Sequence, residues 1–222
     1  MRWTVPNILT ALRLLAAPLM AVVFLVLPRP YADMVAFALF TSASLTDFLD
    51  GYLARAWDQR TRIGTMLDPI ADKAMVVIAL GVLLSVSSMS PALLLPAALI
   101  LFREVFVSGL REYLGAVSGT LAVTLVAKWK TTVQMIAIAV LLLHGIAEHY
   151  FGMGVWGMDE ATLTAVLNAD VPDEGGIGML WTAMQLTGWG GLALLWLAAV
   201  LTAISGADYF RKALPHLKEP VQ

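Results

Sequence analysis

The stretch TDFLDGYLARAWDQRTRIGTMLDPIADK, residues 46–73, places four aspartates at the facing ends of two apolar segments. The four are Asp47 and Asp50 in the first segment and Asp68 and Asp72 in the second. Their spacings of three and four residues put each pair on one face of a helix. If a short turn near Gln59 joins the two helices, all four carboxylates lie roughly 10 to 20 Å from that turn. The sequence therefore predicts one cluster of carboxylates near a membrane interface.

The composition predicts a membrane protein. The chain has 222 residues, of which 59% are apolar and 14% are charged, and its mean hydropathy is +0.80. Soluble domains contain about 25% charged residues. The formal net charge of −2 gives no support for nucleic-acid binding, and the absence of Cys excludes disulfides, thiolate nucleophiles and zinc–thiolate sites.

Six apolar runs are close to the 20 or so residues that a helix needs to cross the hydrocarbon core. They cover about residues 4–28, 31–56, 63–87, 91–112, 121–146 and 178–206. None has the alternation of a barrel strand, so we expect an all-α, polytopic membrane protein with six transmembrane helices in a single domain, 1–222. The first run is too long for a signal peptide, and we expect it to be retained as a span.

Basic residues predict the orientation of these helices. With the N-terminus in the cytoplasm, only Arg29 falls in an outer loop. The cytoplasmic ends and loops then hold Arg2, Arg55, Arg60, Arg62, Arg111, Lys128, Lys130, Arg211, Lys212 and Lys218. This asymmetry favours a cytoplasmic N-terminus and a carboxylate cluster on the same side. The acidic, Gly-rich segment 147–177 carries no Lys or Arg and is expected to be a loose extracytoplasmic loop without chemistry of its own.

Four ionised carboxylates at this depth repel one another and are costly to desolvate, so the sequence predicts cations among them. Oxygen ligands without Cys or His favour Mg²⁺ or Mn²⁺. Four carboxylates suit a pair of ions, as in enzymes that displace phosphoryl groups. Arg55 is placed to hold a phosphate, while Gly51, Ala54 and Gly64 leave backbone accessible to a ligand. Small residues at this spacing are also typical of helix packing.

The pattern Asp47-x-x-Asp50-Gly51-x-x-Ala54-Arg55, followed after eight residues by Gly64-x-x-x-Asp68-x-x-x-Asp72, resembles the complete signature of the CDP-alcohol phosphatidyltransferases. The resemblance implies six transmembrane helices, a homodimer and two divalent ions beside a CDP-linked lipid. It implies that Asp47, Asp50 and Asp68 bind metal. It also implies that Asp72, which we include with the metal ligands, deprotonates the acceptor hydroxyl. Gly51, Ala54, Arg55 and Gly64 would line the cytidine and diphosphate site.

From the residues alone, Asp72 is also the favoured base, because it is the acid deepest in the membrane and partial desolvation makes a carboxylate more basic. In the first helix, Asn7, Thr10 and Arg13 fall near one face and are expected to reach the nucleotide. For Asn7 and Thr10, a role at the helix entry is the alternative.

Three further segments resemble the bacterial family members that use glycerol 3-phosphate as acceptor. They are VPNILTALRLLAAP (5–18), REVFVSGLREYLG (103–115) and KWKTTVQM (128–135), with Ala127 standing where a Gly is expected. This resemblance implies residence in the bacterial cytoplasmic (inner) membrane. The cations Arg103, Arg111, Lys128 and Lys130 would bind the acceptor phosphate. Arg111 and the lysines could instead follow the positive-inside rule, but Arg103 lies well inside a helix, beside Glu104.

These observations favour transfer of a phosphatidyl group from CDP-diacylglycerol to glycerol 3-phosphate, which gives phosphatidylglycerol phosphate and CMP. The same chemistry with inositol phosphate, serine or phosphatidylglycerol as acceptor is an alternative. A carboxylate-lined cation transporter is a second alternative, although transporters usually place such residues near the membrane midplane. An inactive lipid-binding scaffold would require a broken signature, and every position is present.

Overall fold

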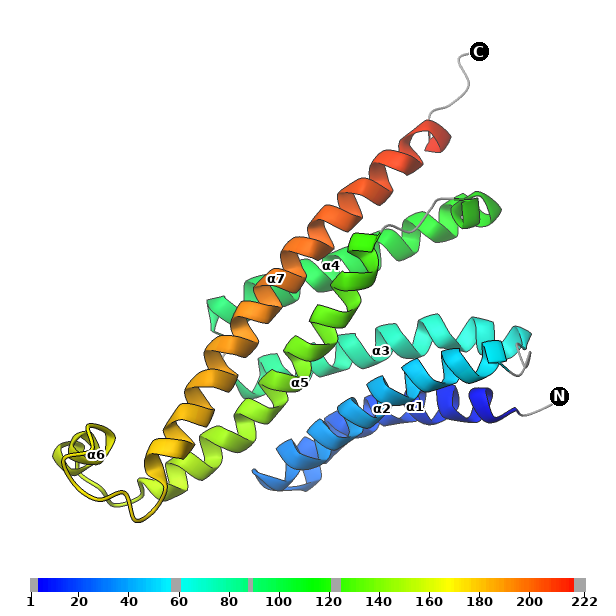
Figure 1. The fold of residues 1–222 in the computed structure, drawn as a ribbon. Helices are drawn as coiled ribbons and strands as arrows, with labels where there is room; N and C mark the ends of the chain where they lie inside the picture. The colour runs from blue at the N-terminus through cyan, green and yellow to red at the C-terminus, as the bar shows by residue number, and fades with distance from the viewer. Residues whose placement is uncertain (1–3, 57–60, 88–89, 121–124, 218–222) are drawn as a thin grey trace. The chain divides into compact units, whose positions relative to one another are not determined.

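The computed structural model describes residues 4–56, 61–87, 90–120 and 125–217. Within these ranges it describes the side chains except at 6, 48–56, 62, 116, 120 and 125–128. In chain order the helices are α1 (Val5–Val26), α2 (Tyr31–Ala56), α3 (Arg62–Val86), α4 (Pro91–Leu114), the 3₁₀ helix η1 (Gly115–Thr120), α5 (Leu125–Gly154), α6 (Glu160–Leu167) and α7 (Ile177–Leu217) (Figure 1). These ranges contain no strand, so the predicted all-α fold is confirmed.

Each predicted apolar run forms a long helix. Among the described residues, α1, α3, α4, α5 and α7 are long and apolar enough to cross a membrane. The sixth long helix is α2, which has 26 residues and includes Asp33 and Asp47. Large apolar side chains lie on the outside, where Leu25 is 85% exposed and Trp189 is 70% exposed. Lipid rather than water suits such a surface, and the chain is a multi-pass membrane protein.

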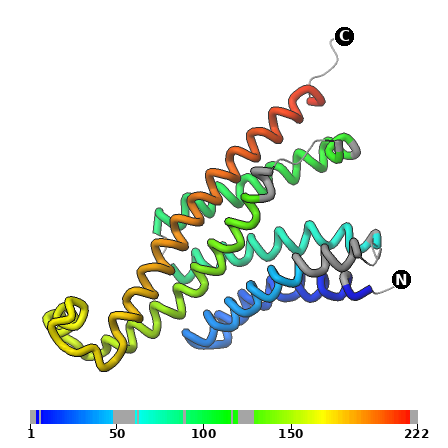
Figure 2. The backbone as a smooth tube through the Cα atoms, in the orientation of Figure 1, coloured from blue at the N-terminus to red at the C-terminus, as the bar shows by residue number. Residues whose placement is uncertain are grey.

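The chain folds into two compact units. The first contains Met1–Leu83 and Ile138–Gly191, and the second contains Leu84–Ala137 and Leu192–Gln222. In the first unit, α1 and α2 run antiparallel and side by side, and α3 then reverses the chain direction again (Figure 2). Fully buried residues fill the core of this unit: Ala17, Met20, Phe40, Ala71, Met75 and Leu80. In the second unit the corresponding core contains Leu93, Ala97, Ile100, Leu195 and Ala198.

Local sequence signals fix several helix ends. Pro91 starts α4, where its missing N–H is not needed, and Gly115 ends the helix with φ +52°, a conformation that glycine adopts readily. At the start of α7, the Asp173 carboxylate accepts hydrogen bonds from the N–H groups of Ile177 at 2.7 Å and Gly178 at 2.9 Å. These bonds satisfy two of the amide groups that a helix start leaves without helical partners.

The segment 147–177 is more helical than the sequence predicts, and the expectation of a loose loop is wrong for much of it. α5 continues to Gly154, and α6 follows within the same segment. The Phe151 ring packs 5.2 Å from the Trp181 ring, which extends the contact between α5 and α7. Asp159 caps α6 by accepting from the Thr162 N–H at 2.9 Å, and its hydrogen bonds with Thr162 lower the pKa of the Asp159 carboxyl.

An ion pair ties the α1–α2 connection to α2. The Arg29 guanidinium donates to the buried Asp33 carboxylate through Nε at 2.7 Å and Nη2 at 3.0 Å, and these bonds raise the pKa of Arg29 above its usual value. Glu148 of α5 adds an oxygen 3.7 Å from Nη2. Gly145 allows α5 to approach this pair, because a Cβ there would overlap Asp33 Oδ1 and lie 2.6 Å from Arg29 Nη2.

We expect Gly145→Ala to lower the stability of the protein by about 1 to 3 kcal/mol, because the methyl group displaces a packed ion pair. Gly152→Ala is the matched control, since it lies in the same helix and its Cβ would meet nothing within 4 Å. Thermal unfolding of both variants in one detergent makes the comparison. Equal melting temperatures for the two variants would contradict close packing at Gly145.

Candidate active site

Three polar side chains form a buried stripe on α1. Asn7, Thr10 and Arg13 are spaced three residues apart, which places them near one face of the helix. Their exposed fractions are 4%, 1% and 2%. Thr4, outside the helix, is the N-cap residue of α1. Neither Asn7 nor Thr10 is therefore the N-cap residue of α1.

The polar stripe of α1 reaches three of the four signature aspartates. Arg13 Nη1 donates to Asp47 Oδ1 at 2.6 Å and to Asp72 Oδ1 at 2.9 Å. Thr10 Oγ1 donates to Asp68 Oδ1 at 2.7 Å. The structure thus brings together carboxylates of α2 and α3 around two neighbouring turns of α1. The approach of Asp47 and Asp72 to one guanidinium is in keeping with the expected cluster, and the membership of all four aspartates in it stays a prediction.

Asn7 meets the start of α3. The Thr61 hydroxyl donates to Asn7 Oδ1 at 2.8 Å and accepts from the Gly64 N–H at 3.0 Å. A Cβ at Gly64 would lie 2.6 Å from Asn7 Oδ1, so a larger residue there would displace the Asn7 side chain. Close helix packing is sufficient to explain the glycine at this signature position, and its predicted contact with the nucleotide stays a prediction.

The site carries excess negative charge. Asp47, Asp68 and Asp72 contribute three negative charges against the single positive charge of Arg13, a net of −2. The Asp47 and Asp72 side chains are 43% and 48% exposed, so both are accessible to a ligand. Among the described side chains, no three acids or histidines are close enough to share one ion, and Arg13 bridges Asp47 and Asp72. The oxygen donors and the unbalanced charge nevertheless fit hard divalent cations.

Several predicted site residues lie outside the side chains that the structure describes. Asp50, Gly51, Ala54 and Arg55 belong to the helical backbone of α2, and Lys128 belongs to α5. Their predicted contacts with metal, nucleotide or acceptor stay predictions.

The second unit contains a buried charged group that we call the Glu104 cluster: Arg103, Glu104 and Lys130. Glu104 Oε1 accepts from Lys130 Nζ and from Arg103 Nη1, the latter at 3.1 Å. Lys130 is only 5% exposed. Arg103 Nη2 is also 3.4 Å from the Ser205 hydroxyl of α7. Because Lys130 is buried and paired with a carboxylate, its position is not explained by contact with lipid headgroups.

Arg111 lies further along α4, towards its C-terminal end. Its guanidinium is 5.2 Å from the centre of the Tyr209 ring. Together with the Glu104 cluster it gives three positive charges and one negative charge, a net of +2. Three of the buried polar atoms without a hydrogen-bond partner in the described part of the chain lie on α5 and α7 of this unit: Gln134 Oε1, Thr202 Oγ1 and Tyr209 OH. Buried polar groups normally have partners, so these atoms are candidates for contact with a polar ligand.

Sequence reasoning missed the partners of Arg13 and Glu104. Arg13 is separated by 34 and 59 residues from the two aspartates that it contacts, and Glu104 is separated by 26 residues from Lys130. The available signal was the presence of these charged residues inside apolar helices, where an ionisable side chain is expected to have a specific partner.

The sequence of this chain is similar to those of known proteins. A family model described as CDP-alcohol phosphatidyltransferase matches residues 3–167. The CDP-diacylglycerol–glycerol-3-phosphate 3-phosphatidyltransferase of Cereibacter sphaeroides is 57% identical, over 99% of both chains. Proteins of the same name from Salmonella typhimurium and Shigella flexneri are 43% and 41% identical. Those alignments cover 64% and 70% of this chain, and 78% and 86% of the respective relatives.

Proposed function

The chain belongs to the CDP-alcohol phosphatidyltransferase family, and we propose that it transfers the phosphatidyl group of CDP-diacylglycerol to glycerol 3-phosphate. The products are phosphatidylglycerol phosphate and CMP. The observation that carries this proposal is the 57% identity to an enzyme of that name along almost the whole of both chains. The intact aspartate signature agrees with an active enzyme, and membership of an enzyme family favours this function over cation transport. Incorporation of labelled glycerol 3-phosphate into lipid by purified protein tests the proposal.

The reaction is a displacement at phosphorus. A hydroxyl oxygen of the acceptor forms a bond to the phosphorus that carries the diacylglycerol. The bond from that phosphorus to the oxygen of CMP breaks, and CMP leaves with the electron pair. Asp72 accepts the hydroxyl proton, as its half-exposed carboxylate is accessible to an acceptor. Arg13 holds this carboxylate through the 2.9 Å hydrogen bond and thereby fixes its position.

We further propose that Mg²⁺ or Mn²⁺ binds at the aspartates. Asp47, Asp50, Asp68 and Asp72 would hold a pair of ions, which would supply positive charge to the diphosphate and the attacking oxygen. The net charge of −2 on the described groups supports this proposal. Thr10 donates to Asp68 and so fixes the orientation of one carboxylate from the neighbouring helix.

The acceptor phosphate has a candidate site in the second unit. A dianionic phosphate needs positive charge and hydrogen-bond donors, and the Glu104 cluster with Arg111 offers a net charge of +2. Glu104 holds Arg103 and Lys130 in fixed positions. We propose that Arg103, Arg111 and Lys130, with Lys128 beyond the described side chains, bind the phosphate of glycerol 3-phosphate.

We expect Lys130→Met and Arg111→Ala each to raise the KM for glycerol 3-phosphate at least about tenfold and to change the KM for CDP-diacylglycerol less than about twofold. The reason is that each substitution removes a cation from the acceptor site alone. Arg211→Ala is the control, because it removes an exposed basic residue of α7 outside the cluster. Initial rates are measured against each substrate in turn. A normal acceptor KM in both variants would contradict the site.

We also propose a homodimer in the bacterial cytoplasmic membrane, with the connection between α2 and α3 facing the cytoplasm. The uneven distribution of Lys and Arg supports this orientation. The chain has no Cys, so Gln59→Cys and Thr164→Cys each introduce a single label site. In intact cells, a membrane-impermeant maleimide is expected to label Thr164→Cys of α6 and not Gln59→Cys. Labelling of Gln59→Cys from outside would overturn the orientation.

A further inference from the structure

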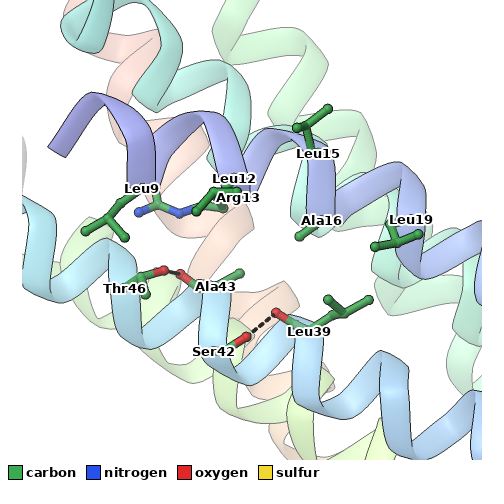
Figure 3. Close-up of a pocket in the computed structure, with 10 residues that line it drawn as sticks. All are labelled: Leu9, Leu12, Arg13, Leu15, Ala16, Leu19, Leu39, Ser42, Ala43 and Thr46. Atoms are coloured by element: carbon green, nitrogen blue, oxygen red, sulfur yellow. Dashed lines mark hydrogen bonds between the residues drawn. The ribbon is translucent and has the colours of Figure 1, made fainter. Parts of the chain in front are cut away.

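An apolar groove runs between α1 and α2 in the first unit (Figure 3). Its volume is about 440 Å³, and half of its ten lining residues are leucines, four from α1 and Leu39 from α2. Leu9 and Thr46 lie at one end, and Leu19 and Leu39 lie at the other. Leu12 and Leu19 are 56% and 48% exposed, so the groove is open on the side that faces lipid.

The hydroxyl groups along the groove are already hydrogen-bonded within the protein. The Ser42 hydroxyl donates to the Leu39 carbonyl at 3.1 Å, and the Thr46 hydroxyl donates to the Ala43 carbonyl at 2.9 Å. Arg13, the charged residue of the lining, donates to Asp47 and Asp72. The groove therefore offers an occupant apolar contact along its length.

The dimensions of the groove suit one hydrocarbon chain. From Leu9 to Leu19 the helix rises about 15 Å, which is half of the hydrocarbon core and so the depth of one leaflet. The groove has a volume of about 440 Å³ over that length and is lined mostly by apolar side chains, which suits an extended hydrocarbon chain.

One end of the groove lies at the candidate active site. Thr46 precedes Asp47 in the chain, and Arg13 belongs both to the lining and to the aspartate contacts. A lipid whose diphosphate is bound at the aspartates has its glycerol backbone beside this end. A membrane lipid without the CDP group can also place a chain in this groove, but it has no diphosphate to bind at the aspartates.

We propose that the groove between α1 and α2 binds one acyl chain of the CDP-linked lipid substrate. This inference rests on the proposed function, because it takes the donor to be a diacyl lipid bound at the aspartates. The groove then aligns the scissile phosphorus by holding the chain on one side of the glycerol backbone, and it favours donors whose chains are long enough to fill it.

Bulky substitutions in the groove test the proposal. Ala16→Phe fills it from a partly exposed position on α1, and Ser42→Phe fills it from an exposed position on α2. Ala38→Phe, at an exposed site of α2 outside the lining, is the matched control. We expect both groove variants to raise the KM for dioleoyl CDP-diacylglycerol at least about tenfold. The KM for the dihexanoyl donor should change less than about twofold. The control should behave as the wild-type protein with both donors.

Retained turnover of the short-chain donor shows that a variant is folded, and it separates this inference from the proposed function. A wild-type protein that uses neither donor would end the proposed function. Use of both donors with no selective effect of either groove variant would end the groove assignment alone.

A binding measurement that does not depend on turnover completes the test. CDP-diacylglycerol with a diazirine in one acyl chain is expected to label residues 9–19 or 39–46, and excess unlabelled CDP-diacylglycerol should suppress the labelling. If a diazirine-labelled phosphatidylcholine gives the same adducts and CDP-diacylglycerol does not compete, the groove holds bulk lipid and the proposal is wrong. A cross-link from these segments to a second protein chain, in place of lipid adducts, would also overturn it.

Discussion

Replacing Asp72 with Asn is expected to slow CMP release at least about a hundredfold while CDP-diacylglycerol still binds, because a general base contributes about 10² to 10⁴ in rate. Asn has nearly the same volume as Asp, and its amide oxygen can still accept the hydrogen bond that Arg13 donates at 2.9 Å. The substitution therefore removes the base and one negative charge but preserves the contact between α1 and α3.

Single-turnover CMP release and equilibrium binding of CDP-diacylglycerol measure the two effects separately. Asp208→Asn is the control, because Asp208 is paired with Lys212 on the surface of α7, 2.8 Å away. It should leave turnover unchanged. An Asp72→Asn protein that is folded, binds the donor and keeps turnover within a few fold of wild type would remove Asp72 from the proton transfer.

Removal of divalent cations is expected to abolish CMP release, and Mg²⁺ or Mn²⁺ should restore it. The three described aspartates carry three negative charges against the one positive charge of Arg13, a net charge of −2. The diphosphate of the donor adds further negative charge, so substrate binding without added cations is unfavourable. An independent readout is thermal stability, because a ligand that binds the folded state at about 100 times its Kd adds about 2.7 kcal/mol.

The melting temperature of the wild-type protein should rise with Mg²⁺ or Mn²⁺, and Asp68→Asn should reduce the rise. Asp208→Asn again serves as the control and should show the full wild-type rise. Full turnover in EDTA, with no change in melting temperature on addition of either ion, would contradict metal binding at the aspartates.

The sequence predicts the parts of this fold that depend on local spacing. Long apolar runs need no partner information to be recognised as helices, and each predicted run is a helix in the structure. The approach of Asp47 to Asp72 also follows from local geometry, because a short connection between two helices sets residues at equal distances from the turn side by side. Both aspartates then contact one guanidinium, that of Arg13.

Contacts that depend on packing between distant segments could not be predicted in this way. The spacing of Asn7, Thr10 and Arg13 places them on one face, but it does not say which aspartate each would meet. The pairing of Glu104 with Lys130 likewise requires the register of α4 against α5. In the segment 147–177, the many glycines and acidic residues led to the prediction of a loop. The composition did not reveal the cap at Asp159, which starts a short helix, or the contact of Phe151 with Trp181.

The most direct test of the central claim is product analysis with purified wild-type protein, CDP-diacylglycerol, Mg²⁺ and a mixture of equal concentrations of glycerol 3-phosphate, serine, inositol phosphate and phosphatidylglycerol. Mass spectrometry of the extracted lipid identifies the acceptor, and released CMP gives the stoichiometry. We predict phosphatidylglycerol phosphate as the dominant product, formed in a one-to-one ratio with CMP. Predominant formation of the serine, inositol phosphate or phosphatidylglycerol product would contradict the acceptor assignment, and absence of CMP release with every acceptor would contradict the proposed reaction.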